Sequence, residues 1–132
     1  MTSVKDDEVR TFLEAYGRAL SEGNLRGVSA AWETPALVLS DRGAIEVQSA
    51  KQIEEFFGAA RRQYTERGIV TTKPQIAKLE WLSDKMVQVR ARWLLLTANK
   101  DRKGEELSLY VLRRDDEDKW RIRVTIALAG EL

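Results

Sequence analysis

The hydrophobic residues change their spacing near Ile69, and this change limits the possible folds more than any other feature of the sequence. Before Ile69, apolar side chains recur every three or four residues, which is the period of an amphipathic helix. After Ile69 the spacing becomes two, which is the period of a β-strand. Helices followed by strands predict an α+β fold, in which the helices cover an apolar face of an antiparallel sheet.

Three helices are predicted in the first half of the chain. The first carries an apolar stripe that includes Tyr16, and the third carries one that includes Phe56. Ser, Asp and Asn are preferred at helix starts, and Gly is preferred just after helix ends. We therefore expect helices that begin at Ser3 or Asp6, at Asn24 and at Ser49, and that end at Gly23, Trp32 and Gly68.

Six β-strands are expected, two of them before the third helix. Asp41-Arg42-Gly43 is a hairpin signal between the first two strands. Short turns join the last four, so these should form an antiparallel meander. The predicted strands are Ala36–Ser40, Ala44–Gln48, Gln75–Leu82, Met86–Leu96, Glu105–Arg114 and Trp120–Ala127. The order is α-α-β-β-α-β-β-β-β, and 132 residues suit a single domain spanning 1–132.

The composition excludes several classes of chemistry. The chain has no Cys and no His, so disulfides, thiolate chemistry, metal binding by those residues and an imidazole base are ruled out. A net charge of +1 does not favour nucleic acid or an anionic membrane as a partner. The longest apolar run, Trp93–Leu96, is far shorter than the ~20 residues of a membrane span. We expect a cytoplasmic protein without metal or cofactor.

Several segments carry a resemblance to a known family: Tyr16–Leu25, Val28–Trp32, Pro35–Asp41, Ser49–Phe57 and Lys119–Arg123. Together with the element order, they resemble the nuclear transport factor 2-like superfamily, and within it the SnoaL-like and ketosteroid isomerase-like branch. The resemblance implies a cystatin-like cone. Its curved, mixed and mostly antiparallel sheet would be covered by three helices on the concave face, with a pocket beneath the third helix. It also implies a homodimer through the convex face.

The resemblance places two hydrogen-bond donors in that pocket. Tyr16 matches the tyrosine that donates to the enolate oxygen in ketosteroid isomerases, and Tyr110 matches their second donor. The catalytic base of that family falls on Ser40, which is a poor base without imidazole. Asp41 is adjacent, but neighbouring side chains on a strand point to opposite faces. The donors are therefore kept and the base is missing, which argues against ketosteroid isomerase activity. Tyr16, Asp41 and Tyr110 are the candidate catalytic residues.

Two mutually exclusive interpretations are possible for which side chains of the last strand face the pocket. The family register turns Arg121 and Arg123 into the pocket, where Arg123 would bind a carboxylate or phosphate. Simple alternation instead buries Trp120, Ile122, Val124 and Ile126. A shift of one residue exchanges the two arrangements.

Aromatic residues complete the predicted ligand site. Trp32, Phe56 and Trp93 either line the pocket or belong to an ordinary core. The predicted ligand-binding residues are Tyr16, Trp32, Ser40, Phe56, Trp93, Tyr110 and Arg123.

Three functions are compatible with this site. The first is binding of an apolar or amphipathic small molecule. The second is an isomerase, cyclase or dehydratase that acts on a polyketide- or steroid-like carbonyl compound and uses a carboxylate such as Asp41 as its base. The third is a dimerisation module whose pocket has collapsed. The sequence leaves the choice among them open.

Overall fold

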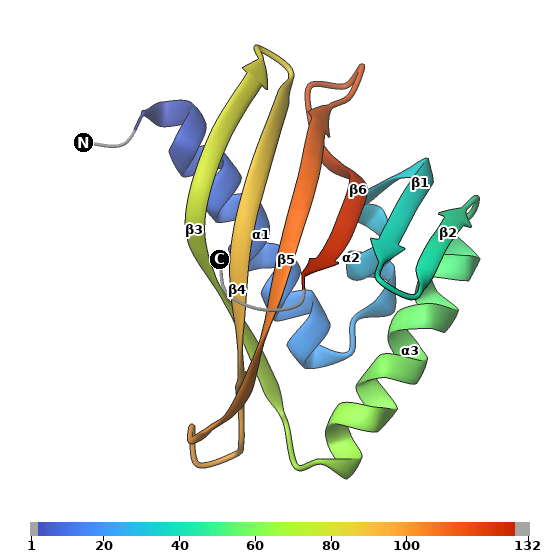
Figure 1. Cartoon of the computed structure of the whole chain (residues 1–132), viewed down its shortest axis with the longest axis vertical. Helices are drawn as coiled ribbons and strands as arrows, with labels where there is room; N and C mark the ends of the chain where they lie inside the picture. Colours follow the sequence, from blue (N-terminus) through green and yellow to red (C-terminus); the bar gives the residue numbers. More distant parts are fainter. Residues whose placement is uncertain (1–2, 129–132) are drawn as a thin grey trace.

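A computed structural model describes residues 3–128. Its elements follow the expected order: α1 Val4–Glu22, α2 Leu25–Ala30, β1 Trp32–Ser40, β2 Gly43–Val47, α3 Ala50–Glu66, β3 Thr71–Ser83, β4 Met86–Leu96, β5 Arg102–Arg114 and β6 Trp120–Leu128. The strands form one open sheet in the order β2-β1-β6-β5-β4-β3. The helices lie on one side of it (Figure 1). The predicted α+β fold is confirmed.

The sheet is mixed, as expected. β1 and β6 are parallel, and every other neighbouring pair is antiparallel. The strands β3 to β6 form the predicted meander. Within the described residues, no helix combines the length and the apolar character that crossing a membrane requires.

Side chains cap the helices at three of the predicted positions. Ser3 Oγ accepts a hydrogen bond from the backbone N–H of Asp6, so Ser3, and not Asp6, caps α1. Asn24 and Ser49 accept equivalent bonds at the starts of α2 and α3. Gly23 ends α1 with φ 69°, a left-handed conformation that glycine adopts without steric cost.

Three predicted boundaries were wrong. Trp32 begins β1 instead of ending α2, because it pairs with Ile122 of β6 and is buried. β3 begins at Thr71 and β5 at Arg102, since both strands extend to pair with Leu96 at the end of β4. The proline in β3 is tolerated because β3 is the edge strand of the sheet.

An irregularity in β6 resolves the question of which way its side chains point. Ile122 pairs with Leu112 of β5, but Val111, the residue before Leu112, pairs with Val124, so Arg123 is an extra residue in β6. Such a bulge reverses the facing of the residues that follow it. Trp120 and Ile122 therefore point inward before the bulge, and Thr125 points inward after it.

Neither interpretation of the last strand was right along its whole length. Arg121 and Arg123 lie on the outer face of the sheet, where Arg123 Nη1 donates to Glu33 Oε1 at 2.8 Å. The prediction that Arg123 faces the pocket is thus wrong, because the bulge follows Ile122 and leaves the arginines outside. Alternation failed in turn for Val124 and Ile126, which the bulge places on the outer face.

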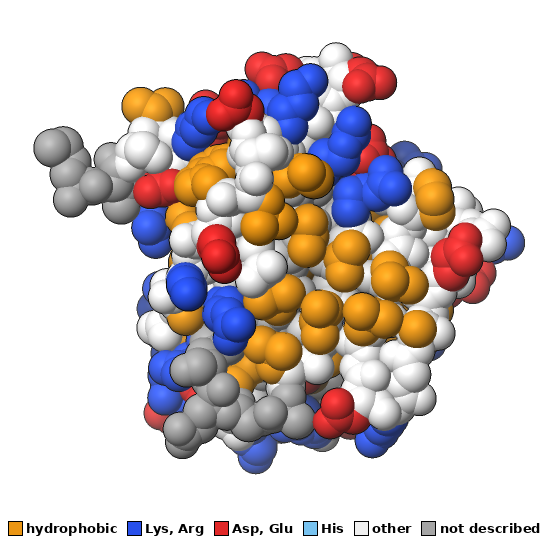
Figure 2. Space-filling model, turned by 45° about the horizontal axis from the view of Figure 1, so that its top comes forward, with side chains coloured by type: hydrophobic (Ala, Val, Ile, Leu, Met, Phe, Trp, Pro, Cys, Tyr) orange, Lys and Arg blue, Asp and Glu red, His pale blue; other side chains and the backbone are white. Residues whose placement is uncertain are grey.

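The outer face of the sheet carries an apolar band. Figure 2 shows hydrophobic side chains gathered in the middle of a face, with charged side chains around them. In the strand register, six apolar residues form two rows across β1, β6 and β5: Leu37, Val124 and Val111 in one, and Leu39, Ile126 and Leu109 in the other. Glu46 flanks the band on β2, and Gln88 and Arg90 flank it on β4.

Candidate functional site

A cavity of about 670 Å³ lies between the helices and the inner face of the sheet. α1 contributes Tyr16 to its lining and α3 contributes Phe56, while the strands contribute Trp32, Trp93 and Tyr110. These are five of the seven residues that were predicted to bind a ligand. The volume is within the usual range for small-molecule sites, roughly 300–1,000 Å³.

Two tyrosine–tryptophan pairs form the inner end of the cavity. Trp32 Nε1 donates to Tyr16 Oη at 3.1 Å, and Trp93 Nε1 donates to Tyr110 Oη at 2.9 Å. Both tyrosines are buried, with 4% and 5% of their surface exposed. An indole N–H can only donate, so each phenolic oxygen is fixed as its acceptor. The hydroxyl proton of Tyr16 is left to donate to another group, whereas the Tyr110 hydroxyl also lies within hydrogen-bond reach of the hydroxyls of Ser108 and Thr125.

Burial keeps both phenols protonated. It raises the pKa of Tyr16 well above its usual value, and the nearby Tyr110 adds to that rise. Burial also raises the pKa of Tyr110 to about 12, although the hydroxyl of Ser108 and the indole of Trp93 act in the opposite direction. Both side chains are therefore neutral hydrogen-bond donors at physiological pH.

Aromatic rings form the wall beside these donors. The ring of Phe57 meets that of Tyr16 edge-on at 6.4 Å between centroids, and it lies 6.0 Å from that of Trp32. Phe56 packs against Phe57 but remains half exposed. The wall suits a flat or aliphatic apolar molecule.

The mouth of the cavity carries charged and polar groups that the sequence interpretation missed. The Tyr64 hydroxyl on α3 donates to the Glu106 carboxylate on β5. Arg61, which lies against Gly23 at the end of α1, and Arg67, which lies near Gly104 of β5, also line the cavity. The signal for Glu106 was available, because it alternates with Ser108 and with Tyr110, which the resemblance had placed in the pocket.

The remaining predicted site residues do not line the cavity. Ser40 is exposed at the end of β1, where its Oγ accepts a hydrogen bond from the backbone N–H of Arg42. Asp41 is exposed in the turn that follows. Among the described residues, the carboxylates that line the cavity are Glu105 and Glu106, and both are exposed at its mouth. The inner end therefore carries donors, with the acids at the opening.

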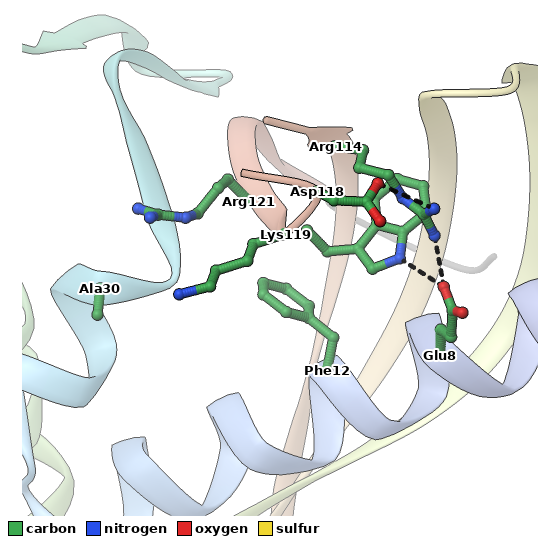
Figure 3. A pocket seen from close by; sticks show the side chains of 8 residues that line it. Glu8, Phe12, Ala30, Arg114, Asp118, Lys119 and Arg121 are labelled. Carbon is green, nitrogen blue, oxygen red and sulfur yellow. Dashed lines mark hydrogen bonds and ion pairs between the residues drawn. The ribbon is translucent and has the colours of Figure 1, made fainter. Parts of the chain in front are cut away.

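A second hollow, of about 520 Å³, lies between α1, α2 and the turn before β6 (Figure 3). The charged side chains that line it form ion pairs. Arg114 pairs with Glu8 and with Asp118, and its guanidinium lies 4.6 Å from the centre of the Trp120 ring. Arg121 points away from this group and pairs with Asp115 at 3.1 Å. We interpret this cluster as a brace that holds α1 against the sheet.

Comparisons with known proteins agree with this architecture. A family profile described as NTF2-like protein (DUF6841) matches residues 6–129, so the chain belongs to this family of NTF2-like proteins. No curated protein matches the sequence.

Solved structures show the same fold at low sequence identity. An NTF2-like protein of unknown function from Shewanella oneidensis is 18% identical, with a TM-score of 0.72 over 94% of this chain and 98% of that one. A domain of unknown function with a cystatin-like fold from Nostoc punctiforme is 16% identical, with a TM-score of 0.77 over 100% and 81%. A ketosteroid isomerase-like protein from Erwinia carotovora is 13% identical, with a TM-score of 0.68 over 98% and 100%.

Proposed function

We propose that this protein binds a small, mainly apolar molecule in the cavity beneath α3. The observation that carries the proposal is the pair of buried tyrosine hydroxyls, each oriented by an indole N–H, at the inner end of an aromatic-walled cavity. Such a site combines apolar surface for affinity with a few fixed donors for orientation. A carbonyl oxygen on the ligand would accept from Tyr16 and Tyr110.

Binding is better supported than catalysis. Proton abstraction next to a carbonyl held by Tyr16 and Tyr110 requires a carboxylate within hydrogen-bond reach of the reacting carbon. The carboxylates that line the cavity lie at its exposed end, and Glu106 accepts a hydrogen bond from the Tyr64 hydroxyl there. The arrangement therefore orients a bound molecule without a base at the inner end.

Fluorescence of N-phenyl-1-naphthylamine, a neutral apolar dye that brightens when buried, tests the proposal. We expect saturable binding to the wild type. Ala127→Trp should weaken it about tenfold or more, because the new ring fills the cavity that the exposed Ala127 lines. Ala15→Trp, an exposed position on α1 outside the cavity lining, is the matched control and should bind as the wild type does. Absence of dye binding, or equal binding by both variants, would refute the proposal.

We also propose that two copies pair through the apolar band on the outer face. The band spans three strands and is flanked by Glu46 on one side and Arg90 on the other. A two-fold axis parallel to the strands lays the band of one copy on that of the other and brings the acidic edge over the basic edge. A second copy is thus complementary in both shape and charge.

Light scattering coupled to size-exclusion chromatography checks this pairing. The wild type should elute with the mass of a dimer. Ile126→Glu should elute as a monomer, because a carboxylate in the band cannot be buried without a partner. Ile45→Glu, which changes an exposed isoleucine on β2 outside the band, should remain dimeric. A monomeric wild type would contradict the proposal.

A further inference from the structure

Two positive and two negative side chains line the cavity, and they differ in whether they form ion pairs. They are Arg61, Arg67, Glu105 and Glu106. Glu105 is already engaged from outside the cavity, since its carboxylate lies 3.5 Å from Arg92 Nε and 4.0 Å from Arg102 Nη1. Glu106 accepts a hydrogen bond from the Tyr64 hydroxyl and forms no ion pair with either arginine. Among the described residues, no carboxylate forms an ion pair with Arg61 or Arg67, so positive charge predominates at the mouth.

Gly23 leaves space for the guanidinium of Arg61 at the mouth of the cavity. The Arg61 guanidinium lies against Gly23 at the end of α1, where a Cβ would come within 2.7 Å of Arg61 Nε. Any residue with a side chain there would displace the guanidinium. Gly23 therefore has two roles. It ends α1, and it leaves room at the cavity entrance for the guanidinium of Arg61, whose backbone belongs to α3.

On the basis of the proposed function, we infer that the ligand is an amphipathic acid. Its apolar body lies along the aromatic wall, and its single anionic group, a carboxylate or sulfonate, is held at the mouth by Arg61 and Arg67. The inner donors, Tyr16 and Tyr110, then receive a neutral oxygen at the far end of the molecule. Guanidinium groups suit this role because they remain charged and donate in a planar fork.

The carboxylate of Glu106 weakens this preference for an anionic ligand. It lies at the same end as the arginines and repels an incoming anion. Removing that negative charge without changing the size of the side chain should therefore strengthen the preference for an acid. A neutral ligand of the same shape should be indifferent to the change.

Two dyes with a shared skeleton test the inference. N-phenyl-1-naphthylamine is neutral, and 1-anilinonaphthalene-8-sulfonate adds one sulfonate to it. We expect the wild type to bind the sulfonate more tightly, and Arg61→Gln and Arg67→Gln each to lower that affinity about two- to fivefold, the range of exposed ion pairs. The ratio of sulfonate affinity to neutral-dye affinity should fall in both variants, because only the sulfonate carries a charge for the guanidinium to bind. Glu106→Gln should raise affinity for the sulfonate alone. The matched control Arg18→Gln, an exposed arginine outside the cavity lining, should change neither.

The outcomes separate this inference from the proposed function. If the neutral dye binds but the sulfonate binds no better and responds to neither arginine variant, the inference is overturned while the binding function stands. If neither dye binds, both fail. Added salt should weaken only the sulfonate advantage, since screening acts on charge pairs at an exposed mouth. An advantage unaffected by salt and by both arginine variants would also overturn the inference.

Discussion

Ile122→Ala should lower the free energy of unfolding by about 2–5 kcal/mol, the range found when a large aliphatic side chain is truncated in a core. Ile122 is fully buried, with 0% of its surface exposed, and it pairs with the equally buried Leu112. The cavity left behind would be enclosed by the other buried side chains of the core, among them Leu112 and Trp120. Urea unfolding followed by circular dichroism measures the change.

Ile126→Ala is the matched control for this prediction. Strict alternation would bury both isoleucines, because they lie four residues apart on β6. The bulge at Arg123 places Ile126 on the outer face instead. At a protein concentration that keeps copies apart, its truncation should therefore cost less than about 1.5 kcal/mol. Equal losses from the two variants would contradict the bulge.

Alkaline titration should reveal tyrosines that ionise only when the protein unfolds. The pKa of all three, Tyr16, Tyr64 and Tyr110, is raised above the ordinary value of 10.0, mainly by burial. The folded protein therefore holds these protons more tightly than the unfolded chain does. Below pH 10 both states keep them and the stabilisation is complete. Above pH 10 the unfolded chain ionises first, so stability falls as pH rises.

The size of this effect follows from the shift. The pKa of Tyr110 is raised from 10.0 to about 12, so its share of the stability lost by pH 12 is roughly 2–3 kcal/mol. Near-ultraviolet absorbance of tyrosinate and circular dichroism should change together in one cooperative step. Gradual ionisation around pH 10 with unchanged circular dichroism would show that the tyrosines are accessible, and would contradict the buried donor pairs.

The fold was predictable because its signals are local. Caps at Asn24 and Ser49, the glycine after α1 and the change of period near Ile69 each act within a few residues. The errors arose where a residue far away in the sequence determines the local structure. Trp32 joins β1 because of Ile122, ninety residues further along, and the bulge at Arg123 exists only in relation to β5. Neither partner can be read from a local period.

The predictions for the site succeeded and failed for similar reasons. Tyr16, Trp32, Phe56, Trp93 and Tyr110 line the cavity, and all are aromatic residues that the resemblance or the helical spacing had placed inward. Arg123 was placed wrongly because one inserted residue reverses a strand. Arg61 and Arg67 were missed because exposed arginines on a helix look like ordinary solvated residues until a cavity is seen beside them.

The most direct test of the binding site is a crystal structure of the protein with 2-acetylnaphthalene, a neutral aromatic ketone. The account predicts the naphthyl rings against Phe57 and Trp32, with the carbonyl oxygen within hydrogen-bond distance of Tyr16 Oη or Tyr110 Oη. A ketone bound in the hollow beside Arg114, on the outer face, or in the cavity with its oxygen turned toward the mouth would contradict it.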